Sequence, residues 1–244
     1  MIPIRVYRAD LDLLSERACL SLLDDTEKSR AAGIFNRSAR HEFVKSRALL
    51  RLLLSRHTGL PAEMFEFATG ENGKPVLLGS HDIHFNVSHS DGAALVAIAS
   101  AEIGVDIERI DGSVDYAGVA QSVFSRSEIE MLRDASDARR GEVFFSIWTR
   151  KEAYLKATGA GFSSNLPMIS TAAPDGTIED LGSSAGCCAW HAFDLPAGEY
   201  LKAALVTAAR ECRIDFLDVA DMAELPFPKT LPVAADGACT LTAV

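Results

Sequence analysis

Apolar side chains recur at helical spacing in three stretches of the chain. Within residues 26–57 the apolar set is Phe43, Val44, Leu49, Leu50, Leu53 and Leu54, and Gly59 follows as a stop. This stretch predicts helix in two pieces. Residues 126–134 and 142–158 show the same period, and Gly159 closes the second of them. The pattern therefore predicts helices in both halves of the chain.

Short apolar runs between turn residues predict strands. Residues 82–90, 93–100 and 102–110 form three such runs, joined by Asp91-Gly92 and by a tight connection at 100–102. They predict an antiparallel meander. Strand-like patterns return at "CCAWHAFDL" and "EYLKAALVTA", residues 187–195 and 199–208.

The order of predicted elements repeats along the chain. Aligning residues 43–51 with 148–156 matches Phe with Trp and Arg with Lys, and residues 93–99 echo 202–208. These echoes favour an α+β fold class with two similar α/β lobes arranged as a pseudo-dimer. Chance similarity of short amphipathic segments is the alternative. We expect an N-terminal lobe over 1–110 and a C-terminal lobe over 111–244, with the Pro- and Ala-rich tail after about 220 as a surface wrap or frayed end.

Composition narrows the class of protein. A chain of 244 residues forms one large domain or two small ones, and the net charge of −10 argues against broad nucleic-acid binding. Five cysteines without a CxxC pair favour a reducing compartment. The N-terminus lacks the apolar core of a signal peptide, and the longest apolar run is too short to cross a bilayer. We expect a soluble cytoplasmic protein.

Three carboxylates stand out in this pattern. Alternation along a strand places Asp106 and Glu108 on one face, with Val105 and Ile107 toward the core. A solvated face of an edge strand is the alternative interpretation. Glu152 shares one side of the last predicted helix with residues four positions away, where a surface ion pair is the alternative. Three oxygen ligands with room for phosphate and water suit Mg²⁺.

Positive groups accompany these acids. The turn at Gly73-Lys74-Pro75 presents a lysine, and Ser88-His89 ends a strand beside the Asp-Gly turn. The N-terminal helix is basic within an acidic protein, with Arg37, Arg40, Lys45, Arg47, Arg51 and Arg56. Each feature alone is more often structural or solvated. Together with the acids they favour a polyphosphate ligand.

Four of these motifs resemble a known family. "GKP", "FNVSHS", "GVDIE" and "WTRKEAYLK" occur in the order found in the Sfp-type 4′-phosphopantetheinyl transferases of the holo-acyl-carrier-protein synthase superfamily. Four ordered motifs over residues 73–156 are far more specific than any one of them. The resemblance extends more loosely over nearly the whole chain, and it implies the pseudo-dimeric two-lobe fold.

The resemblance also implies an activity. Family members transfer the 4′-phosphopantetheine arm of coenzyme A to a serine of an acyl or peptidyl carrier protein and release adenosine 3′,5′-bisphosphate. By analogy Asp106, Glu108 and Glu152 hold Mg²⁺, and Glu152 also takes the serine proton. Lys156 stabilises the leaving phosphate, with Lys151 as a second positive group.

The coenzyme A contacts follow from the same resemblance. Ser88 and His89 would contact the pyrophosphate, and Gly73, Lys74 and Pro75 would border the adenosine end. Lys28 and Arg47 are assigned to the 3′-phosphate, although relatives often carry more lysines or arginines in the segment "TEKSRAAGIFNRSAR".

Two other functions use some of the same residues. A metal-dependent nucleotide phosphohydrolase would need no protein partner, and a non-catalytic coenzyme A-binding protein would tolerate loss of the acids. The expected partners are coenzyme A and an apo carrier protein. A built-in pseudo-dimer favours a monomer.

Overall fold

The structure is a computed structural model that describes the chain except residues 71–72, 80–81, 162–164, 182–189, 220–238 and 243–244. The first half contains β1 (Ile2–Asp10), α1 (Glu16–Leu22), α2 (Asp25–Ala32), α3 (Arg37–Thr58), β2 (Phe67–Thr69), β3 (Pro75–Leu77), β4 (His84–Ser90) and β5 (Ala93–Ala99). The second contains β6 (Ile103–Arg109), α4 (Tyr116–Val123), α5 (Arg126–Asp134), α6 (Asp137–Thr158), β7 (Ile169–Ser170), β8 (Thr177–Asp180), β9 (Trp190–Leu195), β10 (Leu201–Thr207), β11 (Cys212–Val219) and β12 (Cys239–Thr242). Short 3-10 helices lie at Leu11–Leu13, Ala62–Met64 and Leu166–Met168.

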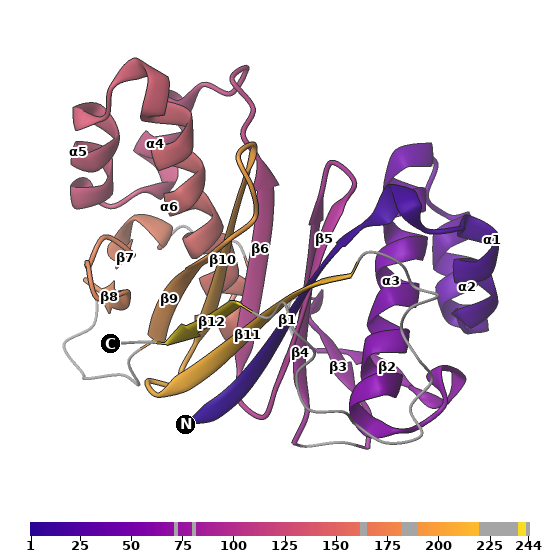
Figure 1. Ribbon diagram of the computed structural model, residues 1–244. Helices are drawn as coiled ribbons and strands as arrows, with labels where there is room; N and C mark the ends of the chain where they lie inside the picture. Colours follow the sequence, from indigo (N-terminus) through magenta and orange to yellow (C-terminus); the bar gives the residue numbers. More distant parts are fainter. Residues whose placement is uncertain (71–72, 80–81, 162–164, 182–189, 220–238, 243–244) are drawn as a thin grey trace.

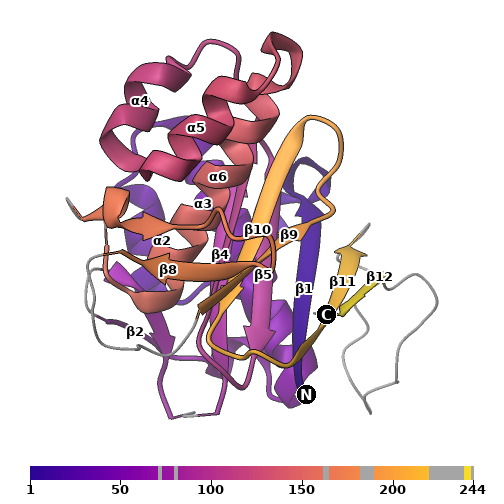
Figure 2. The same ribbon diagram turned by 90° about the vertical axis from the view of Figure 1, so that its left-hand side faces the viewer.

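Two five-stranded sheets form the centre of the molecule. Their strand orders are β12-β11-β1-β5-β4 and β6-β10-β9-β8-β7, with a separate β2-β3 ribbon. Helices α1, α2 and α3 lie on the outer side of the first sheet, and α4, α5 and α6 lie on the outer side of the second (Figures 1 and 2). Alternation within the strands supplies a core between the sheets, where Val6, Leu95, Val105 and Leu205 are fully buried. The predicted α+β class with two lobes is confirmed.

The long helices of the two lobes match closely. Helices α3 and α6 each have 22 residues. Each ends at a glycine in the left-handed region, Gly59 with φ 79° and Gly159 with φ 68°. A residue with a side chain would be strained at such a φ, so glycine ends both helices with the least conformational strain.

A buried arginine fixes the helices of the first lobe. Arg51 of α3 is fully buried. It donates to Glu27 at 2.7 Å and to Asp24 at 2.6 Å, the two residues that form the capping box of α2. It also donates to the carbonyls of Ala62 and Phe65 at 2.8 and 3.1 Å. One cation thus joins α2, α3 and the turn after α3.

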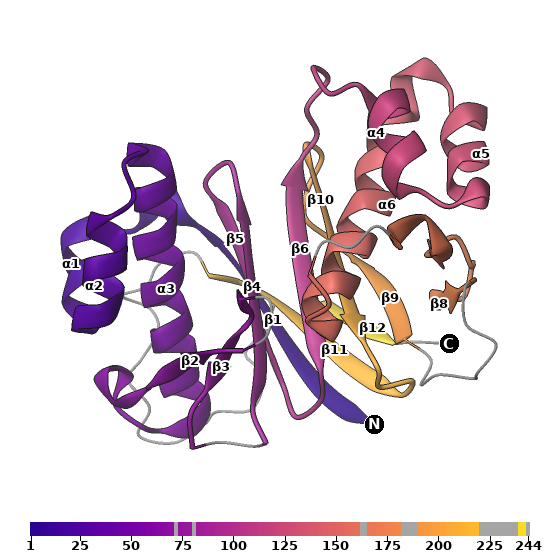
Figure 3. The same cartoon turned by 180° about the vertical axis from the view of Figure 1, so that it is seen from behind.

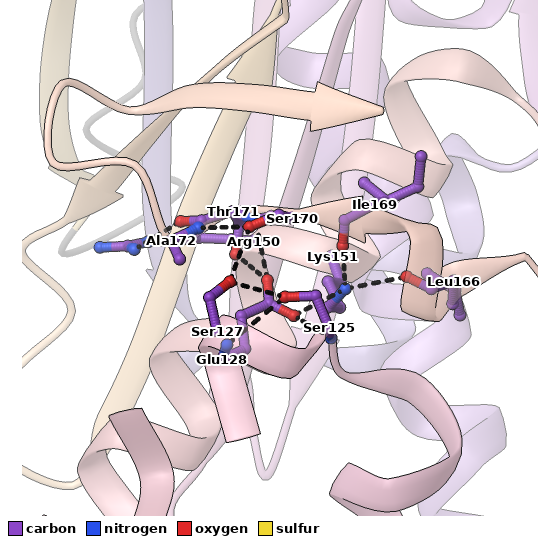
Figure 4. A network of polar contacts seen from close by, with 10 residues as sticks. All are labelled: Ser125, Ser127, Glu128, Arg150, Lys151, Leu166, Ile169, Ser170, Thr171 and Ala172. Carbon is purple, nitrogen blue, oxygen red and sulfur yellow. Dashed lines mark hydrogen bonds and ion pairs between the residues drawn. The ribbon is translucent and has the colours of Figure 1, made fainter. Parts of the chain in front are cut away.

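A buried lysine does the same in the second lobe (Figure 4). Lys151 of α6 pairs with Glu128 at 2.9 Å, and Glu128 forms the capping box of α5 with Ser125. Lys151 also donates to the carbonyls of Leu166 and Ile169, after α6. In both lobes the two accepting carbonyls are three residues apart. The same device in both lobes supports the internal repeat.

This equivalence corrects the sequence alignment of the two lobes. Aligning residue 43 with 148 uses an offset of 105 (148 − 43), which pairs Arg51 with Lys156. The structural offset is 100 (151 − 51), so Arg51 corresponds to Lys151. The apolar patterns of the two helices tolerate either offset, whereas the buried ion pairs and the closing glycines Gly59 and Gly159 agree on 100.

The sheets also correct two topological predictions. Strands β4 and β5 form the predicted hairpin, but β6 pairs with β10 of the second sheet and not with β5. The predicted division at residue 110 does not match the sheets, because β6 belongs to the second sheet and β11 and β12 return to the first.

The remaining element predictions fall close to the structure. Helix α5 has the predicted bounds, α6 begins at Asp137 rather than at 142, and α2 and α3 are the two predicted pieces. Most of the predicted wrap after 220 and the start of the strand predicted at 187–195 lie outside the described residues. Among the described helices, none combines the length and the apolarity needed to span a membrane.

Candidate active site

The two lobes meet along β4 and β6, which are edge strands of different sheets (Figure 3). Side chains of β4 accept the backbone N–H groups that β6 presents along this edge. Asn86 Oδ1 accepts from Val105 at 3.0 Å. The Ser88 and Ser90 hydroxyls accept from Ile107 at 3.4 Å and from Arg109 at 3.3 Å. Because unpaired N–H groups are costly to bury, these side-chain acceptors satisfy the backbone N–H groups at the edge of β6 without joining the two sheets into one.

The seam orients Asp106 toward α6. Val105 and Ile107 face the core between the sheets and are fully buried, as the alternation predicted. Asp106 is only 3% exposed, so the interpretation as a solvated strand face is wrong. Its Oδ1 accepts from Ser88 at 2.8 Å and from Lys156 at 2.6 Å. Lys156 also donates to Ser88, at 2.8 Å, and thereby links both lobes.

Gly104 explains how α6 comes so near to β6. A Cβ at this position would overlap the Ala153 carbonyl oxygen and the Ala157 nitrogen of α6. With glycine there, the backbone of the helix lies directly on the strand. Glu152 and Lys156 are thereby brought over the acids of β6. The glycine of "GVDIE" is therefore a packing residue.

Burial raises the pKa of all three predicted acids, and repulsion from neighbouring carboxylates adds to this rise at Glu108 and Glu152. Burial raises the pKa of Asp106, opposed by Lys156 and by hydrogen bonds from Ser88. Burial and then Asp106 raise the pKa of Glu108, while hydrogen bonds from Ser90 and Trp148 lower it. Burial, Asp106 and Glu108 raise the pKa of Glu152, with Lys156 opposing. Three carboxylates that disfavour each other's charge gain from a shared cation.

The donor set fits a small hard cation. Asp106 Oδ2 is buried without a hydrogen-bond partner, which leaves one carboxylate oxygen free to coordinate. Within the described ranges, no group of three His, Cys, Asp or Glu side chains stands arranged to hold a metal ion, so the three acids would have to converge when the cation binds. An open set of carboxylates that leaves positions for water and phosphate is typical of Mg²⁺.

Lys151 does not join this site. It is 2% exposed and its ammonium is held by Glu128 and two carbonyls, as described above. The prediction that it contacts the leaving phosphate conflicts with this position, and we assign it a structural role. Its place in the apolar stripe with Phe144, Ile147 and Leu155 was a signal of burial in the sequence.

The GKP turn lies at a second part of the seam. Gly73 has φ 84°, and Lys74 donates to Glu102 at 2.9 Å and to the Ala157 carbonyl at 2.8 Å. Lys74 and Pro75 line a cavity of about 450 Å³ between the first lobe and the C-terminal end of α6. Two of the three predicted adenosine contacts therefore line one cavity, and Lys156, on the helix whose end also lines it, contacts Asp106.

Ser88 and His89 face different surroundings. Ser88 contacts Asp106, whereas His89 Nδ1 lies 3.2 Å from Glu42 of α3. Alternation within β4 separates the two side chains. The structure therefore brings Ser88 to the acids and leaves His89 exposed on the α3 side of the seam.

The residues assigned to the 3′-phosphate lie in the first lobe. Arg47 pairs with Glu27 at 3.2 Å and lies over the Phe67 ring at 4.9 Å, with its pKa lowered by burial. Lys28 is exposed and lies 3.7 Å from Asp25. Lys45 and Arg51, two members of the predicted basic face of α3, are buried.

Three residues of the seam escaped the sequence predictions. Asn86 accepts the backbone N–H of Val105 in β6, and Ser90 donates to Glu108. Gly104 leaves room for the backbone of α6 against β6. Polar residues at alternate positions of β4 were the available signal. A core strand rarely carries three polar groups on one side unless they have partners.

Fold and site together define a two-lobed α+β protein with an acidic, lysine-bearing site at the junction of its lobes. Residues 102–206 match the model of the 4′-phosphopantetheinyl transferase superfamily, and residues 15–103 match that of the 4′-phosphopantetheinyl transferase N-terminal domain. Together the two matches cover residues 15–206, and the chain belongs to the 4′-phosphopantetheinyl transferase superfamily. The two matches meet just before β6, where the second sheet begins.

Similar proteins carry the same family name. HetI of Nostoc sp. is 34% identical over 58% of this chain and 61% of its own length. Sfp of Bacillus subtilis is 29% identical over 62% and 66%, and AcpT of Escherichia coli is 37% identical over 49% and 58%. Each is a 4′-phosphopantetheinyl transferase. The match spans less than two thirds of the length of these relatives.

Proposed function

We propose that the protein transfers the 4′-phosphopantetheine group from coenzyme A to a serine of an apo acyl or peptidyl carrier protein. Adenosine 3′,5′-bisphosphate is the second product. The observation that carries this proposal is the seam itself. Three carboxylates of raised pKa lie there, one of them Asp106 with a free oxygen and with Lys156 beside it, and the GKP cavity lies at the end of the helix that carries Lys156.

Asp106, Glu108 and Glu152 are the residues proposed to hold Mg²⁺, which would neutralise charge on the pyrophosphate. Their raised pKa values support this assignment, because a bound cation removes the repulsion among them. The exposed fraction of the Lys156 side chain is 30%, so its ammonium can move from Asp106 to a leaving phosphate.

The transfer forms one bond and breaks one. The serine oxygen attacks the phosphorus next to the pantetheine, and that phosphorus loses the bridging oxygen to the nucleotide. We assign the serine proton to Glu152, whose raised pKa favours proton uptake. Lys156 then offsets the charge of the leaving phosphate.

Coenzyme A is proposed to lie along the seam. Gly73, Lys74 and Pro75 border the adenosine, Ser88 faces the pyrophosphate, and Lys28 and Arg47 approach the 3′-phosphate. His89 lies apart from Ser88, on the α3 side of the seam. The cavity at the GKP turn supports the first of these assignments. The contacts of Arg47 with Glu27 leave Lys28 the more accessible cation of the last pair.

One incubation tests the function. The protein is mixed with coenzyme A, Mg²⁺ and an apo carrier protein, and the carrier is weighed by mass spectrometry. We expect the carrier to gain one phosphopantetheine. Cleavage of coenzyme A without a carrier would instead indicate a phosphohydrolase, and binding without any product would indicate a coenzyme A-binding protein.

A further inference from the structure

Ser90 is the last residue of β4 and contacts the second acid of β6. Its hydroxyl donates to Glu108 Oε2 at 2.8 Å and accepts the N–H of Arg109 at 3.3 Å. A single hydroxyl therefore contacts both the side chain of Glu108 and the backbone directly after it. Because the serine comes from the first lobe and Glu108 from the second, this contact crosses the seam.

The same geometry occurs two residues earlier. Ser88 donates to Asp106 at 2.8 Å and accepts from the residue after it, Ile107, at 3.4 Å. In both pairs the serine and the acid are 18 positions apart. Ser88 and Ser90, two positions apart in β4, thus contact Asp106 and Glu108, two positions apart in β6, with one serine to each acid.

The turn after Ser90 strengthens this contact. Asp91 adopts the left-handed region with φ 49°, and its carboxylate pairs with the guanidinium of Arg109. Successive residues of the first lobe therefore hold successive residues of the second. Ser90 and Asp91 together hold Glu108 and the residue directly after it, Arg109.

We propose that Ser90 is a positioning residue that holds the Glu108 carboxylate for the cation. This inference rests on the proposed function. A glutamate side chain loses conformational freedom when it coordinates a metal, and a hydrogen bond formed beforehand reduces that loss. Outer-shell partners of metal ligands act in this way, and their removal weakens metal affinity by about 10–100-fold.

The test measures Mn²⁺ binding to the full chain by isothermal titration calorimetry, without coenzyme A or carrier. We expect Ser90→Ala to weaken Mn²⁺ affinity by about tenfold. Ser90→Thr keeps the hydroxyl and is expected to restore most of the affinity. Ser21→Ala removes an exposed helical hydroxyl far from the seam and is expected to bind Mn²⁺ like the wild type.

Other variants separate position from folding. Ser90→Cys keeps the side-chain size with only a weak donor, so it is expected to lose affinity while unfolding at the wild-type temperature. With Mn²⁺ at saturation, the transfer rate of Ser90→Ala is expected to recover. Wild-type affinity in both Ser90→Ala and Ser90→Cys would overturn the role of Ser90. If the wild type itself neither binds Mn²⁺ nor modifies a carrier, the proposed function fails first.

Discussion

Glu152 is proposed both to bind the cation and to accept the serine proton, whereas Asp106 and Glu108 are proposed only to bind the cation. Asp106 and Glu108 are hydrogen-bonded to serines of β4, whereas the pKa of Glu152 is raised by burial and by its acidic neighbours, with only Lys156 opposing. A carboxylate in such a place is a good proton acceptor. The three acids can therefore be distinguished by substitution.

We expect Glu152→Gln to bind coenzyme A but to lower the rate of carrier modification by at least about 10²-fold, the usual effect of losing a general base. Raising Mg²⁺ is expected to restore cation occupancy without restoring the rate. The measurement is carrier modification by mass spectrometry over a Mg²⁺ series. Glu142→Gln, an exposed change on the same helix, is the control. Recovery of the rate in excess Mg²⁺ would make Glu152 a ligand only.

At this scale the periods of strand and helix predict that Asp106 and Glu108 share one face and that Glu152 is turned toward them, and the ligand set itself stays a prediction. It did not distinguish Lys151 from Lys156. The two lysines lie on different faces of α6, and only the packing of that helix decides which one contacts the acids. Likewise, Ser88 and His89 were both expected at the pyrophosphate, and alternation within β4 separates them.

The elements α3 and α6 are each fixed by a buried cation, and this leads to a stability prediction. Lys151→Ala leaves the fully buried Glu128 without its ion-pair partner. We expect the free energy of unfolding to fall by about 3–5 kcal/mol. Urea unfolding at constant slope m is the measurement.

Two variants control this prediction. Lys151→Met combined with Glu128→Gln removes both charges and is expected to recover part of the loss. Lys156→Ala lies at a partly exposed position, so it is expected to lower transfer far more than stability. If Lys151→Ala were as stable as the wild type but unable to transfer phosphopantetheine, the structural role would be wrong and the predicted contact of Lys151 with the leaving phosphate would be supported.

The contact of β6 with α6 gives a second element-scale prediction. Gly104→Ala is expected to destabilise the protein by about 1–3 kcal/mol, because a Cβ overlaps the α6 backbone. It is also expected to reduce transfer, since the helix that carries Glu152 and Lys156 must shift. Gly112→Ala meets nothing within 4 Å and is the matched control. Equal melting temperatures and equal transfer rates for the two variants would contradict this account.

Local patterns predicted the hairpin of β4 and β5 but not the change of sheet at β6. A connection of three residues can continue a meander or begin another sheet, and its sequence does not distinguish these outcomes. The pairing of β1 with β11 could not be predicted from the sequence either. Its residues contact a strand some 210 positions away, and nothing in the N-terminal segment records that distance.

The whole molecule carries a net charge of −10, and its acidic site adds a pH dependence. Burial, followed by Asp106, raises the pKa of Glu108, and the pKa of Glu152 is raised likewise. Because the folded protein holds these protons to a higher pH than the unfolded chain, its free energy of unfolding falls as the pH rises above the ordinary carboxyl range. A bound cation offsets this loss.

We therefore expect the melting temperature gained by adding Mg²⁺ to increase as the pH is raised from 5 to 8. Differential scanning fluorimetry with chelator or with Mg²⁺ measures it. Glu108→Gln removes one of the repelling charges, so in chelator at pH 8 it is expected to melt no lower than the wild type. A Mg²⁺ effect that is independent of pH would contradict the proposed ligand set.

The return of β11 to the first sheet sets an order of events during synthesis. In that sheet β1 lies between β5 and β11, and it pairs in parallel with β11 from Ile2 opposite Cys212. At roughly 5–20 residues per second, β1 leaves the ribosome about 10–40 s before β11 does. During that interval one edge of β1 has no strand to pair with. The N-terminal lobe is therefore begun before the second lobe and completed after it, and a nascent chain of this protein depends on protection of that edge until β11 has been synthesised.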